Sequence, residues 1–164
     1  MKISAQNYRG LGNGPAVRGL LKLQKEEDPD ILFLSETKLD EERIKKFRIK
    51  LGMPHMIARK CEGRSGGVAM FWKREIDVSL RWMGRAHIDV DITEKDGFKW
   101  RLTGIYGEPI QELREETWRL LQTLHHQSKL PWLCVRDFNE ILFSFEKQGV
   151  SLNHKVRWIS FVML

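Results

Sequence analysis

Apolar residues recur along this chain with two different periods, and the period changes from one segment to the next. Spacing of three to four positions predicts helices over residues 15–27, 40–51 and 112–125. Alternating or continuous apolar runs predict strands over residues 1–6, 31–34, 55–59, 68–73, 76–82, 87–93, 98–106 and 132–135. The order is strand, helix, strand, helix, several hairpin strands, helix, strand. This order predicts an α/β or α+β domain in which helices pack against a mixed sheet.

Local signals set the ends of these elements. Pro15 suits the first turn of a helix, and Asp40 can cap the second helix, which Gly52 would end. The run from Ile31 to Leu34 is continuously apolar, which is typical of a strand that is buried on both faces.

Composition is consistent with one globular domain, since the 164 residues are 41% hydrophobic and 30% charged. Lys and Arg exceed Asp and Glu by 28 to 22, for a net charge of +6, so the surface should attract polyanions such as nucleic acid. Cys61 and Cys134 have no metal-ligand spacing. A secretion signal or membrane span is not visible, so we expect an intracellular protein.

Four predicted strands end in polar residues. Asn7 follows the first strand, Glu36 the second, Tyr106 the last hairpin strand, and Asp137 and Asn139 the final strand. In open α/β sheets ligands bind beyond the carboxyl ends of the strands. Carboxylate and amide oxygens suit Mg²⁺, which takes one or two protein carboxylates together with phosphate oxygens and water. If the strands are neighbours, these side chains form one magnesium and phosphate site, with Glu36 as the better metal ligand.

Each of these residues also has a purely structural interpretation. Asn7 precedes a glycine-rich bend and can form a turn, and Glu36 can be a solvated strand end. Tyr106 can lie at the edge of the core, and residues 137–139 can form an ordinary turn. Taken singly, these interpretations are favoured, so the functional one depends on the motifs in combination.

Five segments in a fixed order provide that combination. They are Asn7 to Asn13 (NYRGLGN), Pro29 to Lys38 (PDILFLSETK), Gly63 to Gly67 (GRSGG), Leu102 to Gly107 (LTGIYG) and Pro131 to Leu142 (PWLCVRDFNEIL). Together they resemble the abasic-endonuclease-like domain at the start of plant LINE-type non-LTR retrotransposon polyproteins, a branch of the endonuclease/exonuclease/phosphatase superfamily. The resemblance covers residues 1–150 and leaves residues 151–164 as a divergent C-terminal tail.

The resemblance implies a two-layer β-sandwich flanked by helices, with the DNase I-like fold. It also implies a Mg²⁺-dependent phosphodiesterase that nicks DNA to prime reverse transcription, and therefore a nuclear location. Glu36 and Asn7 would hold the metal. Asp137 would activate the attacking water, Asn139 would position it, and Tyr106 would donate toward the developing negative charge. Backbone-phosphate contacts are expected from three cations, with solvated surface cations as the alternative interpretation: Arg9, Lys38 and Arg64.

The sequence departs from the family pattern at three points. Gln6 stands where the family usually has tryptophan, and Arg136 stands where glycine usually precedes the aspartate. The family's closing motifs, an aspartate-bearing strand and a final serine-aspartate-histidine, have no counterpart before Leu164. We therefore expect a C-terminally truncated endonuclease domain with little or no activity. The alternatives are a non-catalytic retroelement relic that binds nucleic acid through its charge, and an enzyme acting on a small phosphate ester.

Overall fold

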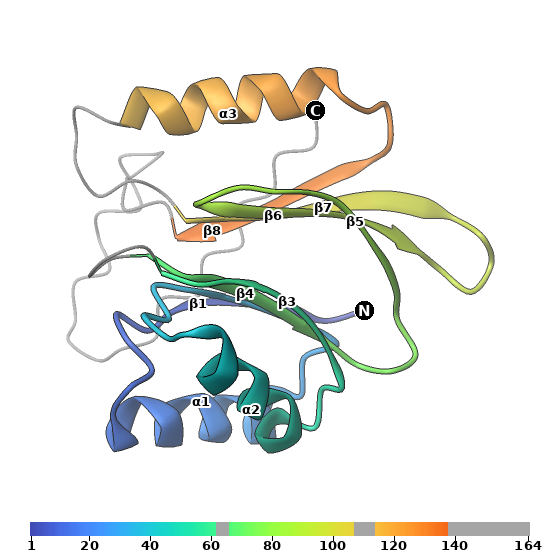
Figure 1. Cartoon of the computed structure of the whole chain (residues 1–164). Helices are drawn as coiled ribbons and strands as arrows, with labels where there is room; N and C mark the ends of the chain where they lie inside the picture. Colours follow the sequence, from blue (N-terminus) through green and yellow to red (C-terminus); the bar gives the residue numbers. More distant parts are fainter. Residues whose placement is uncertain (62–65, 107–113, 138–164) are drawn as a thin grey trace, which may run out of the picture.

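Two four-stranded mixed sheets face each other at the centre of the molecule (Figure 1). The computed structural model describes residues 1–61, 66–106 and 114–137, with the backbone alone for Arg114, Arg136 and Asp137. The first sheet has the order β1-β2-β4-β3, and its strands are β1 (Ile3–Asn7), β2 (Ile31–Ser35), β3 (His55–Arg59) and β4 (Val68–Trp72). The second sheet has the order β5-β6-β7-β8, and its strands are β5 (Asp77–Met83), β6 (His87–Thr93), β7 (Lys99–Tyr106) and β8 (Trp132–Asp137).

Helices cover the outer faces of both sheets. The two helices α1 (Gly14–Glu27) and α2 (Glu41–Leu51) lie against the first sheet, and α3 (Arg114–His126) lies against the second (Figure 1). As predicted, Asp40 caps α2, because its Oδ1 accepts a hydrogen bond from the main-chain N–H of Arg43 at 2.8 Å. The first helix is capped by Asn13, whose Oδ1 accepts from the main-chain N–H of Ala16 at 2.8 Å.

Alternation along the strands divides the core into layers. In β2, Leu32 and Leu34 pack in the cluster beneath α1 and α2, whereas Ile31 and Phe33 pack in the cluster between the two sheets. The prediction that this strand is buried on both faces is confirmed, since all five of its residues are buried. Helices cover one of its faces and the second sheet covers the other.

A glycine allows the two sheets to approach closely. A Cβ atom on Gly104 of β7 would lie 2.3 Å from Cδ2 of Phe33 in β2, which is far below a van der Waals contact. The ring of Phe33 therefore occupies the place of a side chain on the facing strand.

The sandwich implied by the family resemblance is confirmed, but periodicity alone predicted a single mixed sheet. The difference arises because alternation assigns a residue to a face of a strand and does not assign a strand to a sheet. Among the described residues, no helix is long and apolar enough to cross a membrane.

Candidate functional site

The carboxyl ends of four strands meet at one end of the sandwich. β1 runs parallel to β2, with Asn7 in register with Ser35, and β7 runs parallel to β8, with Tyr106 in register with Asp137. The phenol of Tyr106 donates a hydrogen bond to Oε1 of Glu36, which directly follows β2. This bond joins the ends of the two sheets, so the structure brings together three of the predicted site residues and the backbone of Asp137.

Tyr106 and Glu36 lie at the end of the core between the two sheets. Tyr106 packs in the cluster between the sheets and is 8% exposed, while Glu36 is half-buried. The interpretation of Tyr106 as a tyrosine at the edge of the core is therefore correct for its ring. Its hydroxyl, however, donates a hydrogen bond to the carboxylate of Glu36, which the sequence indicated as the metal ligand. A carboxylate that accepts one hydrogen bond retains lone pairs on both oxygens for a cation or a phosphate-bound water.

The backbone around Glu36 is held in an uncommon conformation. Arg9, Glu36 and Lys38 have φ values of 48°, 51° and 52°, in the left-handed region that non-glycine residues rarely adopt. Such conformations persist only where the surrounding structure enforces them, and they cluster at functional sites.

Neighbouring loops supply that enforcement through Thr37, which is only 2% exposed. Its main-chain N–H donates to the carbonyl of Gly67 at 3.2 Å, and its carbonyl accepts from the N–H of Leu11 at 2.9 Å. The N–H of Lys38 donates to the carbonyl of Gly66 at 3.3 Å. The loops that follow β1 and β2 are thus bonded to each other and to the segment that precedes β4, which fixes the position of Glu36.

Asn7 forms a turn, and its position belongs to the face of β1 that carries Ile3 and Ala5 between the two sheets. Its Oδ1 accepts from the main-chain N–H of Arg9 at 3.0 Å, so the structural interpretation of this residue is confirmed. The amide oxygen has a second lone pair that can serve a cation. The next residue, Tyr8, packs against the cluster beneath the helices, and burial raises the pKa of its phenol to about 12.

Two of the predicted residues, Asn139 and Arg64, lie outside the described residues, as does the C-terminal tail. The backbone of β8 is described, and it places Arg136 in register with Ile105, one position before the pairing of Tyr106 with Asp137. Successive positions in a strand belong to opposite faces of the sheet. Position 137 therefore shares the face of Tyr106, and position 136 belongs to the other face.

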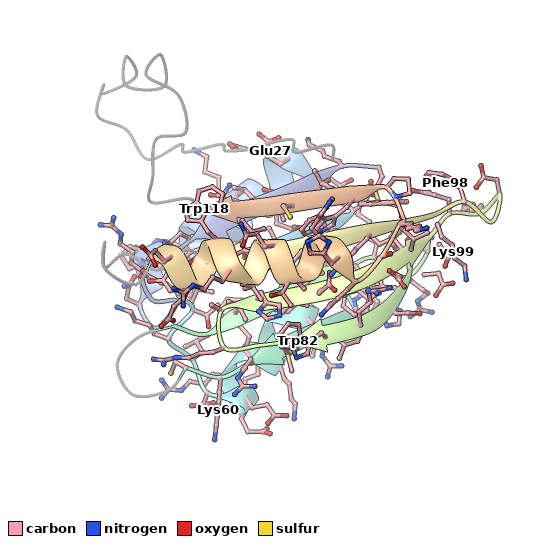
Figure 2. All side chains as sticks on the ribbon, turned by 90° about the horizontal axis from the view of Figure 1, so that it is seen from above. Glu27, Lys60, Trp82, Phe98, Lys99 and Trp118 are labelled. Atoms are coloured by element: carbon pink, nitrogen blue, oxygen red, sulfur yellow. The ribbon has the colours of Figure 1, made fainter. Side chains whose placement is uncertain are left out.

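Basic residues surround this end of the sandwich. Arg9 and Lys38 are both exposed there, which both interpretations of these cations require. Sequence reasoning missed three further cations that strand direction brings to the same end: Arg59 at the end of β3, Lys60 after it, and Arg85 in the turn between β5 and β6. In Figure 2, Lys60 lies well apart from Phe98 and Lys99, which mark the hairpin tip between β6 and β7 at the opposite end. The sequence places these cations at strand ends. It does not show which strand ends lie together, because that depends on how the strands pair.

The oxygen donors at this end suit a hard cation. The described part of the chain contains no cluster of three or more His, Cys, Asp or Glu side chains that could enclose a metal. The two ligands expected from the sequence, the carboxylate of Glu36 and the amide of Asn7, are a sparse set of oxygen donors. Such a set fits Mg²⁺, which keeps several waters and commonly takes only one or two protein carboxylates.

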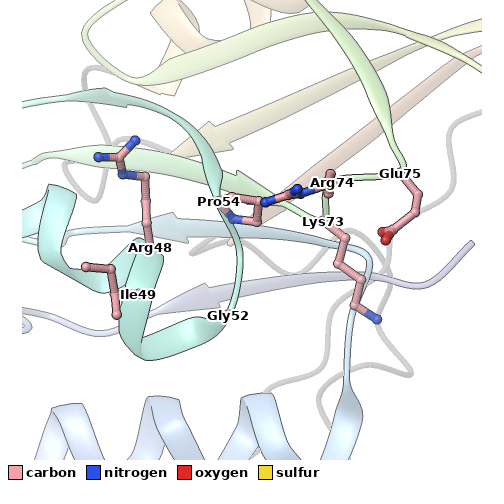
Figure 3. Close-up of a pocket in the computed structure, with 7 residues that line it drawn as sticks. All are labelled: Arg48, Ile49, Gly52, Pro54, Lys73, Arg74 and Glu75. Atoms are coloured by element: carbon pink, nitrogen blue, oxygen red, sulfur yellow. The ribbon is translucent and has the colours of Figure 1, made fainter.

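A separate hollow lies at the other end of the sandwich. It has a volume of about 650 Å³ and is lined by residues of α2, the loop after it and the loop after β4 (Figure 3). Lys73 in its wall is bound to carboxylate oxygens of Asp28 at 2.9 Å and Asp30 at 3.2 Å. Because Trp72 pairs with Ile31, the first residue of β2, this hollow is a whole strand length away from Glu36. We do not assign it to the candidate site.

The architecture defines an α+β sandwich with a polar site at the carboxyl ends of its strands. Residues 3–155 match the Endonuclease/Exonuclease/phosphatase family, and the chain belongs to that family. A comparison with curated protein sequences gives no significant match.

Solved structures of the same fold include enzymes that act on nucleic acids. The endonuclease domain of TRAS1, a telomere-specific non-LTR retrotransposon, aligns with a TM-score of 0.64 at 14% identity over 86% of this chain and 61% of its own. The AP endonuclease LMAP from Leishmania major gives 0.63 at 15% identity over 83% and 54%. The 3′ phosphatase NExo from Neisseria, bound to a product DNA hairpin, gives 0.60 at 19% identity over 85% and 58%. These likenesses concern the fold, and the chain spans less than two thirds of each of the three structures.

Proposed function

We propose that this chain carries the metal-binding side of a Mg²⁺-dependent endonuclease site that hydrolyses phosphodiester bonds in DNA. The observation that supports this proposal is the hydrogen bond between Tyr106 and Glu36, which joins a phenol and a carboxylate from two sheets at the strand ends. A buried tyrosine needs a partner for its hydroxyl, but a solvated glutamate does not need a phenol. Their pairing beside Asn7, in a chain of this family, favours a site that handles phosphate and metal.

Each residue has a role in the proposed reaction. Glu36 and Asn7 would hold Mg²⁺, which when bound supplies a Lewis acid for the scissile phosphate. The Tyr106 hydroxyl lies beside that carboxylate and would donate toward the negative charge that develops on the phosphate oxygens. Asp137, in register with Tyr106, would accept the proton of the attacking water, and Asn139 would orient that water.

The basic residues at this end would contact the DNA backbone. Arg9 and Lys38 are proposed as phosphate contacts, and Arg59 and Lys60 extend the positive potential along the same rim. Arg64, which lies outside the described residues, is proposed as a further phosphate contact from its motif alone. Contacts of this kind contribute affinity without sequence preference and weaken as salt rises. The motif order favours an origin in a plant LINE-type retroelement, and DNA as the substrate would place the protein in the nucleus.

Nicking of supercoiled plasmid is the direct test. We expect weak Mg²⁺-dependent nicking that is abolished by EDTA and reduced, by up to about a hundredfold, in Glu36→Gln, Asp137→Asn and Tyr106→Phe, since single donors or acid/base groups are commonly worth this much. Glu42→Gln is the matched control, because Glu42 is an exposed carboxylate on α2 whose partner is Lys45. Equal activity in all of these proteins would rule out the site.

Two other readouts separate the alternatives. Hydrolysis of a small phosphodiester such as bis(4-nitrophenyl) phosphate at a rate that exceeds plasmid nicking would favour a small-molecule substrate. Salt-dependent binding to DNA in EDTA, without nicking in Mg²⁺, would favour a non-catalytic nucleic-acid-binding protein.

A further inference from the structure

A buried histidine lies directly behind the strand end that carries Tyr106. His87 is the first residue of β6, is only 3% exposed and pairs with Ile105 of β7. The preceding residue, Ala86, accepts a hydrogen bond at its carbonyl from the main-chain N–H of Tyr106 at 2.7 Å. The turn between β5 and β6 is therefore bonded to the residue whose phenol reaches Glu36.

The imidazole ring is enclosed by that same turn. A Cβ atom on Gly84 would lie 2.2 Å from Cε1 and 2.6 Å from Nδ1 of His87, so the ring occupies the space beside the glycine backbone. The main-chain N–H of Gly84 donates to the carbonyl of His87 at 3.0 Å. On another side, the ring of Trp82 meets the imidazole edge-on, with 4.6 Å between the ring centroids and 71° between the planes.

The surroundings of the ring suit a neutral imidazole. Nε2 of His87 is buried and has no hydrogen-bond partner among the described residues. Burial lowers the pKa of His87 below 6.5, the nearby Asp89 opposes this shift, and the positive charges of Arg101 and Arg59 add to it. The nearest carboxylate, Asp89, already accepts hydrogen bonds from Arg101 and Thr103. A second proton on the imidazole would therefore place an N–H donor without an acceptor in a buried position.

We propose that His87 is a positioning residue whose neutral ring holds the β5–β6 turn against the end of β7 and so keeps Tyr106 in reach of Glu36. Protonation of His87 would make the enclosed ring charged, open the turn and release the hydrogen bond from Tyr106 to Ala86. An effect of this opening on catalysis rests on the proposed function. The opening of the turn itself does not.

The sign of the pH dependence follows from the lowered pKa. The unfolded or opened turn binds the proton more tightly than the closed turn, so the closed form is fully stable above pH 6.5. Stability is lost as the pH falls from 6.5 toward the pKa of the closed form. Each pH unit within that window shifts the opening equilibrium by up to about tenfold.

Hydrogen exchange at the Tyr106 amide measures this opening directly. In the unaltered chain, the protection factor, corrected for the intrinsic rate at each pH, should fall by up to about tenfold per pH unit as the pH is lowered from 6.5 toward the pKa of the closed form. The amide of Phe33, in the first sheet, is the internal reference. In His87→Phe the Tyr106 protection should no longer depend on pH, whereas His55→Phe, which replaces an exposed histidine stacked on Trp72, should behave like the unaltered chain.

Two further measurements keep the test decisive if His87→Phe does not fold. An NMR titration of the His87 ring in the unaltered chain should have its midpoint at the pH where the loss of Tyr106 protection levels off, and a midpoint elsewhere would overturn the proposal. Gly84→Ala should displace the ring and lower Tyr106 protection at every pH.

If the exchange results hold but no plasmid nicking is found at any pH, the proposed function fails and the role of His87 in the turn stands. If nicking depends on Glu36 but Tyr106 protection is flat with pH, the inference about His87 fails alone.

Discussion

Removal of the Asp89 carboxylate should be among the most destabilising single changes in this fold. Asp89 is fully buried between the second sheet and α3, and its Oδ1 accepts from Nε of Arg101 at 2.8 Å and from Oγ1 of Thr103 at 2.6 Å. Its Oδ2 accepts from a terminal nitrogen of Arg101 at 2.8 Å. Arg101 is also fully buried, stacks on the ring of Trp132 and donates to the carbonyl of Leu124 near the end of α3.

In Asp89→Ala the guanidinium of Arg101 stays buried but loses both hydrogen bonds to its carboxylate partner. Breaking a buried pair by removing one member typically costs about 3–5 kcal/mol. A domain of this kind has a free energy of unfolding of about 5–15 kcal/mol, so the loss would be a large part of the total. Asp91→Ala is the control, because Asp91 pairs with Arg81 at 2.9 Å on the same strand face but is 26% exposed, and such pairs contribute about 0.2–1 kcal/mol.

Urea unfolding followed by circular dichroism measures both variants. Costs for Asp89→Ala and Asp91→Ala that agree within about 1 kcal/mol, near the upper limit for an exposed pair, would show that the buried pair contributes no more than the exposed one. A double variant, Asp89→Leu with Arg101→Met, should be more stable than Asp89→Leu alone, because apolar replacement of both partners leaves no buried charge.

Two glycine positions give further predictions. Gly67→Ala should destabilise the chain by about 1–3 kcal/mol and lower plasmid nicking, because Gly67 has a φ of 85° and a Cβ atom there would lie 2.6 Å from Oγ1 of Thr37, beside Glu36. Gly104→Ala should cost about 1–3 kcal/mol by overpacking against Phe33, and the smaller side chain in Phe33→Leu should recover part of that cost in the double variant. Both are measured by urea unfolding, with nicking assayed in parallel for the first.

Gly12→Ala is the control for both glycine predictions. A Cβ atom at Gly12 would have no neighbour within 4 Å, and the residue does not have a positive φ. Its replacement should change stability by less than about 0.5 kcal/mol. If Gly67→Ala lowers the free energy of unfolding by no more than this, the loops around Glu36 tolerate a side chain. If the destabilisations by Gly104→Ala and Phe33→Leu are additive in the double variant, the two sheets are not in the contact described.

The local sequence determined the order and type of the elements, because helix and strand periods and cap residues act over a few positions. Asp40 was correctly predicted as a helix cap, and the run from Ile31 to Leu34 was correctly predicted as a strand buried on both faces. The ordered motifs also indicated the family, which residues 3–155 match. Asn7, Glu36 and Tyr106 were recognised as residues at strand ends for the same local reason.

Tertiary structure alone decided which of these strand ends meet. Tyr106 and Glu36 are 70 positions apart and belong to different sheets, and their contact depends on the register of both sheets and on the close approach at Gly104. The left-handed backbone of Glu36 and the burial of Arg101 with Asp89 likewise arise from partners distant in the sequence. Alternation gives each strand two faces but does not choose its neighbours, because that choice depends on the packing energy of the whole sandwich.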